Sequence, residues 1–174
     1  MNDKPKVPQS SPAVLPAGSE AVVWTMQHGQ ERHPFVTFRP ATSDDCPLLA
    51  EFNHQLITDV GLPNRMTVAE MERRMRDCLA GEYRAVIFND IKEILAYALY
   101  CEQPEEIYLR QFFVVRHRRR QGIGRRAVQI LRSEVWPKRR RLRVAALVSN
   151  TGGVAFWQAV GYSDSSLQLE ILPE

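Results

Sequence analysis

One stretch constrains the fold of this chain more than any other: it runs from Glu106 to Leu131 and reads EIYLRQFFVVRHRRRQGIGRRAVQIL. Its first part, Ile107 to Val115, is dense in β-branched and aromatic residues on both alternating faces, which is typical of a strand covered on both sides. After Gly124 the apolar residues fall three or four positions apart, which predicts an amphipathic helix, and Pro137 ends that helix at or before Trp136. This order of strand, glycine turn and helix is the form of a phosphate-binding unit.

The turn carries the groups that a bound phosphate needs. The first backbone N–H groups of a helix are free and lie at the positive end of its dipole, and Gly122 and Gly124 let the backbone approach a ligand closely. Arg119, Arg120 and Arg125 are available to neutralise negative charge. The alternative is that the glycines only shape a turn and the arginines form a solvated face. The combination of strand, arginine run, turn and helix favours phosphate binding.

The spacing Arg119-x-x-Gly122-x-Gly124 between a strand and a helix resembles the signature R/Q-x-x-G-x-G/A of the GNAT superfamily of N-acetyltransferases. In that family the backbone of this turn holds the pyrophosphate of acetyl-coenzyme A (acetyl-CoA), and the preceding strand lies beside the pantetheine arm. Gly122-x-Gly124-x-x-Ala127 also fits a dinucleotide-binding fingerprint, but that fingerprint expects an acid about twenty residues later, where this chain reads RRRLRVAALV. The resemblance therefore implies acetyl-CoA as co-substrate.

A second block, NTGGVAFWQAVGY, resembles the family pattern of Asn, Ala, a Tyr seven positions after the Asn, then Gly and an aromatic residue. Asn150, Gly161 and Tyr162 match, whereas Gly153 replaces the Ala and Trp157 stands at the Tyr position. The family's Tyr commonly protonates the departing thiolate of coenzyme A. An indole N–H donates hydrogen bonds but is no acid near neutral pH. Trp157 is thus expected to pack against the cofactor arm, with a purely structural role in the core as the alternative.

The order of predicted elements extends the resemblance over residues 34–174, which are expected to form one domain. Residues 1–33 are rich in Pro and small polar residues and are expected to be a disordered tail, with a short strand at 22–26 left open. The first predicted elements are a strand at 35–39, a helix capped by Thr42, Ser43 or Asp44, a break at 59–65, a helix from Thr67 to Gly81 and strands at 84–88 and 93–101 around Asn89 and Asp90. The strand and helix described above follow, and then a strand at 144–148, a helix after Asn150 and two short strands, the last at 167–172.

This order predicts an α/β (α+β) fold of the GNAT kind. We expect a central mixed, mostly antiparallel twisted sheet of about six to seven strands, flanked by about four helices. No apolar run approaches a membrane-spanning length and no signal-peptide core follows the N-terminal lysines, so a cytoplasmic protein without membrane contact is expected. Three cysteines without paired spacing argue against a disulfide framework or a metal site.

The basic residues are concentrated, since Arg116 to Arg143 contains twelve Lys or Arg and one acid, Glu134. Such a block binds nucleic acid, a membrane surface or a polyphosphate cofactor, and coenzyme A is a sufficient partner for part of it. The run Lys138 to Arg143 is expected to be a solvated loop before the next strand. Nucleic-acid binding is the weakest hypothesis, because the block is wedged between core elements and lacks exposed interleaved aromatics.

Aminolysis of a thioester needs a neutral amine, a stabilised oxyanion and a leaving thiolate that is protonated or tolerated. The resemblance implies that the oxyanion donor is a backbone N–H of residues 113–115, where the central strand splays from its neighbour. Many relatives carry a Glu base on a neighbouring strand, but the matching position here is Ala145. The catalytic candidates are Glu106, Tyr108, His54 and Trp157, with Glu102 and Glu105 also considered, and a solvent-fed proton path without a dedicated base is equally open.

The family resemblance also implies where the ligands lie. The acceptor is expected against the loop between the first two helices and the last strands, at 53–66 and 162–166. Candidates for acceptor binding are Asn53, His54, Gln55, Arg110 and Gln111. Candidates for cofactor binding are Phe112, Phe113, Val114, Arg119, Arg120, Gln121, Gly122, Ile123, Gly124, Arg125, Asn150 and Trp157.

The resemblance implies an N-acetyltransferase that moves the acetyl group from acetyl-CoA to a primary amine of a small molecule or a protein, by direct attack in a ternary complex. A catalytically degenerate acyl-CoA binding or sensing domain is the first alternative, because the usual Tyr and Glu are replaced. The nucleic-acid binding module is the second. A homodimer is left open.

Overall fold

The computed structural model describes residues 35–167 and 169 of the 174. All of these lie in one compact unit. The expected tail at 1–33, the strand left open at 22–26 and most of the strand expected at 167–172 fall outside the described residues. The division of the chain at residues 33 and 34 therefore stays a prediction.

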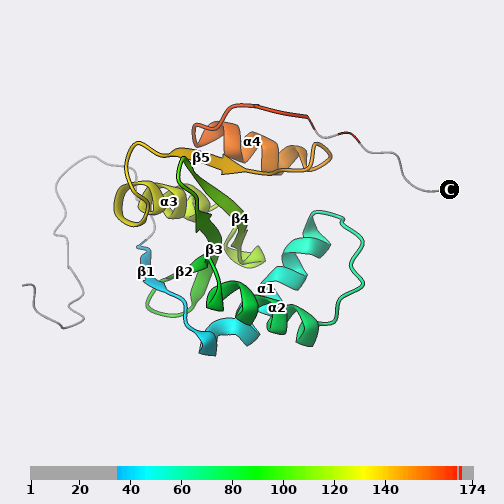
Figure 1. The fold of residues 1–174 in the computed structure, drawn as a ribbon. Coiled ribbons are helices and arrows are strands. Elements are labelled where there is room, and N and C mark those ends of the chain that lie inside the picture. Colours follow the sequence, from blue (N-terminus) through cyan, green and yellow to red (C-terminus); the bar gives the residue numbers. More distant parts are fainter. Residues whose placement is uncertain (1–34, 168, 170–174) are drawn as a thin grey trace, which may run out of the picture. The chain divides into compact units, whose positions relative to one another are not determined.

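The described part contains a five-stranded sheet with the strands in sequence order (Figure 1). Neighbouring strands are antiparallel from the first to the fourth, and the fifth is parallel to the fourth. This mixed, mostly antiparallel sheet confirms the predicted fold, although the described residues supply five strands in place of about six to seven. The strands are β1 (Thr37–Pro40), β2 (Tyr83–Asn89), β3 (Ile94–Glu102), β4 (Glu106–Val114) and β5 (Arg141–Val144).

Four α-helices flank the sheet, as predicted: α1 (Cys46–Asp59), α2 (Val68–Ala80), α3 (Ile123–Ile130) and α4 (Thr151–Ala159). Short 3₁₀ turns at Ser43–Asp45 and Arg116–Arg118 precede α1 and α3, and α3 continues into a π-helical turn, Leu131–Val135. The predicted cap of α2 is present, because the Thr67 hydroxyl accepts a hydrogen bond from the Glu70 N–H at 3.2 Å. Gly81 ends that helix as expected.

The helices cover opposite faces of the sheet (Figure 1). On one face α1 packs onto the strands, and Leu49, Tyr97 and Phe113 are buried there. On the other face α3 buries Ile123 against Leu109 of β4. β4 thus runs between two apolar layers, which is why its sequence is apolar on both alternating faces.

The strand predicted at 144–148 is wrong in its bounds, since β5 occupies Arg141–Val144. The prediction rested on apolar composition, whereas the observed bounds depend on parallel pairing with the first half of β4. Leu142 and Val144 are half-buried against the core on the α3 face, and the two arginines between and before them are exposed. β5 is therefore an amphipathic strand, and the run 138–143, expected to be a loop, supplies most of it.

Candidate cofactor and acceptor site

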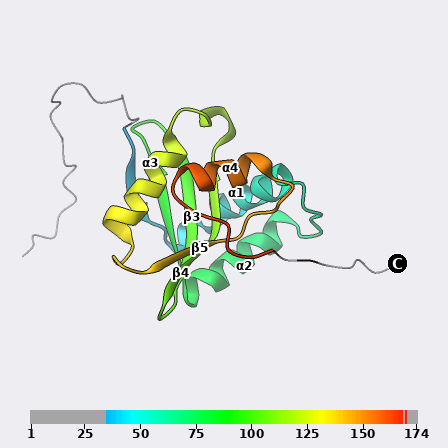
Figure 2. The same ribbon diagram turned by 90° about the horizontal axis from the view of Figure 1, so that it is seen from above.

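β5 accompanies β4 over only the first half of β4 (Figure 2). Their pairing runs from Glu106 opposite Arg141 to Leu109 opposite Val144, whereas the pairing of β4 with β3 continues to Val114. Within the part of the chain that the structure describes, residues 110–114 therefore have no strand partner on the β5 side. An open edge of backbone lies there, directly before the glycine turn.

The hydrogen-bond alternation of an antiparallel pair decides which amides face this edge. The Val115 N–H donates to the Leu95 carbonyl at 2.9 Å. The backbone N–H of Phe113 therefore also points toward β3, whereas the N–H groups of Phe112 and Val114 point away from it. In agreement, the Val114 carbonyl accepts a hydrogen bond from Arg119 Nε at 2.8 Å, outside the sheet. Of the three expected oxyanion donors, residues 113–115, the N–H of Val114 is thus the one directed to the open edge.

A β-bulge at Arg110 lies where β4 parts from β5. Gln111 pairs with Leu99 and Leu109 with Tyr100, which leaves Arg110 as the extra residue. Its Nη1 donates to the Tyr83 hydroxyl at 2.9 Å, and its guanidinium carbon lies 5.1 Å from the centroid of that ring. The side chain proposed for acceptor binding is therefore held across the sheet against β2.

The turn after β4 contains two residues with left-handed backbone conformation. Arg120 and Gly122 have φ angles of 62° and 79°. Gly122 is the N-cap of α3, and its carbonyl accepts the first intrahelical bond, from the Arg126 N–H at 3.0 Å. The N–H groups of Ile123 and Gly124 therefore remain without an intrahelical partner.

The arginines of the run differ in their partners. Arg116 and Arg119 both donate to the Asp59 carboxylate, each at 2.5 Å, and Arg118 donates to Glu93 at 2.5 Å and to Asp90 at 3.0 Å. These contacts occupy side chains that the sequence presented as free cations. Arg120 and Arg125 are exposed. The contact of Arg119 with phosphate stays a prediction, because the Arg119 guanidinium is bonded to Asp59 and to the Val114 carbonyl in this structure.

The remaining cofactor candidates contribute mainly backbone. Phe113 and Ile123 are 2% and 1% exposed, so their side chains belong to the two cores. Gln121 bonds locally, donating to the His117 carbonyl at 3.1 Å. Gly124 lies against α4, because a Cβ atom there would approach the Phe156 ring to 3.1 Å. The turn thus packs closely against α4, the helix of the second sequence block.

An aromatic wall joins that helix to β4. Phe112 stacks on Phe156 with a centroid distance of 5.9 Å, and Trp157 lies 5.4 Å from Phe112 and 5.3 Å from Tyr162. Trp157 of α4 therefore packs between Phe112 of β4 and Tyr162, which follows the helix. The Tyr162 hydroxyl is buried and has no hydrogen-bond partner among the described residues, and burial raises the pKa of Tyr162 to about 12. At that pKa its hydroxyl is protonated at neutral pH.

Asn150 has a structural task at the start of α4. Its Oδ1 accepts a hydrogen bond from the Gly153 N–H at 2.9 Å, which is an N-cap. A Cβ atom at Gly153 would come within 2.5 Å of Asn150 Nδ2. An Ala at this position would therefore require the capping side chain of Asn150 to move.

Two acceptor candidates are brought together. Asn53, 7% exposed, accepts a hydrogen bond from Gln111 Nε2 at 2.8 Å, and Gln111 Oε1 accepts one from the Tyr97 hydroxyl at 3.0 Å. This chain of polar groups links α1 to β4 and β3 beneath the bulge. His54 and Gln55 are half-buried on the neighbouring positions of α1.

Two catalytic candidates lie apart from the Val114 amide. Arg143 pairs with Glu106 at 3.1 Å and its guanidinium carbon lies 5.7 Å from the Tyr108 ring centroid. Glu106 is eight residues before Val114 on the same strand, which at about 3.3 Å per residue separates them by roughly 25 Å. The structure therefore does not bring Glu106 to the amide that faces the open edge.

These observations agree with a comparison against protein-family models. Residues 49–162, more than half of the chain, match the acetyltransferase (GNAT) family. The chain belongs to this family. The match spans the elements from α1 to Tyr162 and includes both sequence blocks.

Solved acetyltransferase structures share the fold. A predicted acetyltransferase from Clostridium acetobutylicum, solved with acetyl-CoA, has 18% identity and a TM-score of 0.64 over 79% of this chain and 96% of its own. An acetyltransferase from Thermus thermophilus has 20% identity and a TM-score of 0.62 over 74% and 86%. An aminoglycoside antibiotic 6′-N-acetyltransferase from Acinetobacter haemolyticus has 16% identity and a TM-score of 0.61 over 79% and 98%. No curated protein matches the chain.

Sequence reasoning does not identify the roles of two residues of this GNAT site. It places Asp59 in the helix break and in the expected acceptor segment 53–66, but it does not predict the pairs of Asp59 with Arg116 and Arg119. Phe156 was overlooked beside Trp157, and its contact with Gly124 depends on how α4 packs on the turn. Each omission reflects a contact between segments that are distant in the chain.

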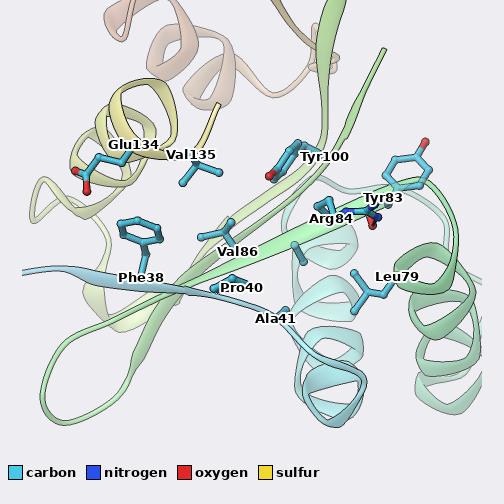
Figure 3. Close-up of a pocket in the computed structure, with 11 residues that line it drawn as sticks. Phe38, Pro40, Ala41, Leu79, Tyr83, Arg84, Val86, Tyr100, Glu134 and Val135 are labelled. Carbon is cyan, nitrogen blue, oxygen red and sulfur yellow. Dashed lines mark hydrogen bonds between the residues drawn. The ribbon is translucent and has the colours of Figure 1, made fainter. Parts of the chain in front are cut away.

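A pocket lies away from this GNAT site, between β1, the start of β2 and the π-helical turn (Figure 3). None of the predicted site residues lines it. The pocket is lined by Phe38, Pro40, Ala41, Leu79, Tyr83, Arg84, Ala85, Val86, Tyr100, Glu134 and Val135.

Among the described residues there is no group of three metal-ligating side chains, and no described helix has the length and apolar character needed to cross a membrane.

Proposed function

We propose that the protein is an acetyl-CoA dependent N-acetyltransferase that acts on a primary amine of a small molecule or a protein. The observation that carries this proposal is the junction of the open edge of β4 with the left-handed turn at Arg120 and Gly122. A pyrophosphate would accept hydrogen bonds from the N–H groups at the start of α3. The pantetheine arm would then lie along residues 112–114, where the amides of Phe112 and Val114 face the open edge.

The residues present fit such a substrate. The turn from Arg119 to Arg125 contains no acid, and the exposed Arg120 and Arg125 flank the N–H groups of α3. The Val114 N–H is directed to the edge along which a thioester would lie. Solved relatives add support, since the Clostridium acetobutylicum protein was solved with acetyl-CoA.

The reaction we propose is direct aminolysis. The lone pair of a neutral amine attacks the thioester carbon, the Val114 N–H stabilises the developing oxyanion, and the C–S bond breaks to release the thiolate. The amine loses a proton to water and the thiolate gains one. Neither transfer is assigned to a protein side chain, because Glu106 is paired far along the strand and Trp157 is not an acid.

The replacement of the family's Tyr by Trp157 favours a second candidate, an acyl-CoA binding or sensing domain without turnover. Nucleic-acid binding has less support, because Arg116, Arg118 and Arg119 are paired with acids. Acetyl-CoA binding is expected of both the acetyltransferase and the sensing domain, whereas amine-dependent turnover is expected of the acetyltransferase alone.

The test is calorimetry with acetyl-CoA, followed by thiol release measured against a panel of amines that includes neutral, anionic and polycationic acceptors. We expect saturable acetyl-CoA binding and amine-dependent thiol release. Binding without release for any amine would favour the sensing domain. Absence of binding would overturn both candidates, and binding of duplex DNA that weakens steeply with salt would favour the nucleic-acid module.

A further inference from the structure

Asp59 is the last residue of α1, and its carboxylate bridges two arginines that precede the candidate cofactor turn. Oδ1 accepts hydrogen bonds from Arg116 at 2.5 Å and 2.9 Å, and Oδ2 accepts one from Arg119 at 2.5 Å. The Asp59 side chain is 19% exposed, so it is largely covered by its neighbours. Burial acts to raise its pKa, but the hydrogen bonds of Arg116 and Arg119 outweigh this and lower the pKa of Asp59.

Arg119 carries this link onward to β4. Its Nε donates to the Val114 carbonyl at 2.8 Å, and its guanidinium carbon lies 5.1 Å from the Phe113 ring centroid. A planar guanidinium held by a carboxylate, a carbonyl and an aromatic face has little freedom. The contacts therefore run without interruption from Asp59 through Arg119 to Val114, whose N–H faces the proposed thioester site.

On its other side Asp59 begins the α1–α2 loop, residues 60–67. The hydrogen bonds recorded for residues 60–66 are local: their first N–H groups bond to the last turn of α1, and Asn64 bonds to the backbone of Met66. The sulfur of Met66 accepts a long contact from Arg74 at 3.7 Å. Through its ion pairs with Arg116 and Arg119, Asp59 thus connects the start of this loop to the candidate cofactor turn.

We propose that Asp59 is a positioning residue through which occupancy of the cofactor turn is transmitted to the α1–α2 loop. This inference rests on the proposed function, because it requires a polyphosphate ligand at the turn. A bound pyrophosphate places negative charge beside the arginines that Asp59 holds, so the free energy of the Asp59 pairs differs between the free and bound forms. Because residues 60–67 follow Asp59 directly, that difference changes the stability of the loop when the turn is occupied.

The test is hydrogen–deuterium exchange of the full chain with and without coenzyme A, in wild type, Asp59→Asn and Asp45→Asn. Asp45 is a matched control, because it forms a similar pair with Arg39 at 2.6 Å at the other end of α1. In wild type and Asp45→Asn, coenzyme A should slow exchange both at 115–124 and at 60–67. In Asp59→Asn it should slow exchange at 115–124 only.

An unchanged response of the loop in Asp59→Asn would overturn the inference, as would a wild-type loop that does not respond. A wild-type turn that does not respond to coenzyme A would overturn the proposed function together with this inference. If Asp59→Asn does not fold, Arg119→Gln breaks the same link from the other side and should uncouple the loop in the same way. Asp59→Glu, which keeps the charge, should restore part of the response.

Kinetics give a second measurement once an acceptor is known. Asp59→Asn should raise KM for the acceptor about fivefold or more, the lower end of typical coupling between two sites, and leave the dissociation constant of acetyl-CoA, measured by calorimetry without acceptor, within about threefold. Asp45→Asn should change neither constant. An equal rise in both constants in Asp59→Asn would indicate general loosening of the structure and contradict the positioning role.

Discussion

Gly124 lies in the first turn of α3 and close to the Phe156 ring. A Cβ atom there would meet the Phe156 ring at 3.1 Å, and a carboxylate would add negative charge at the first turn of α3, where the pyrophosphate is proposed to lie. Gly124→Asp should therefore abolish acetyl-CoA binding. Calorimetry measures the affinity, and circular dichroism checks that the variant is folded. A folded variant that binds as wild type does would show that the phosphate is not held at this turn.

Trp157 tests whether the leaving thiolate needs an acid. The indole packs against Phe112, Phe156 and Tyr162, so Trp157→Phe keeps most of these contacts and should retain kcat within about threefold. Trp157→Tyr adds a hydroxyl and should raise kcat only if proton transfer limits the rate, in which case the gain is about a hundredfold. The measurement is kcat against pH for the three forms with one acceptor. A fall by orders of magnitude in folded, cofactor-binding Trp157→Phe would mean that the indole N–H itself is required.

The start of α4 is stabilised by the Asn150 cap, whose side chain leaves little room for a Cβ atom at Gly153. Asn150→Ala should destabilise the protein by about 1 kcal/mol, because the Gly153 N–H loses its acceptor. Gly153→Ala should gain little in wild type, since its Cβ displaces the Asn150 side chain, but should stabilise Asn150→Ala by about 1 kcal/mol through helix propensity. Urea unfolding of the two single variants and the double variant measures this coupling. Additive effects would exclude the steric account.

The stability of the folded domain should depend on pH through Asp45. The Arg39 hydrogen bond lowers the pKa of Asp45 to about 2, below its unfolded value near 3.8. A carboxyl with a depressed folded pKa stabilises the protein above the unfolded pKa and loses that contribution as pH falls through the folded pKa. Asp45→Asn should therefore be less stable than wild type at pH 6, by up to about 1 kcal/mol, and nearly equal at pH 2. Urea unfolding at both pH values checks this, and a constant difference between them would rule out the linkage.

The candidate site was predicted in part. The glycine turn follows from local spacing, and the structure gives that turn its left-handed residues, Arg120 and Gly122. The partners of the arginines could not be predicted, because Asp59, Asp90 and Glu93 come from other segments of the chain. The cofactor and acceptor contacts of individual side chains stay predictions. Glu106 shows why, since its identity suggested a base while its pairing with Arg143 and its position on β4 argue against one.

Local sequence was enough to predict the elements whose formation depends on neighbours in the chain. The Thr67 cap, the Gly81 end of α2 and the strand, turn and helix around Gly122 all rest on interactions within a few residues. Tertiary structure alone decided the bounds of β5, the direction of the Val114 amide and the contacts of Arg119 with Asp59 and the Val114 carbonyl. These depend on which distant segments pair and in what register, and composition and periodicity contain no information about that pairing.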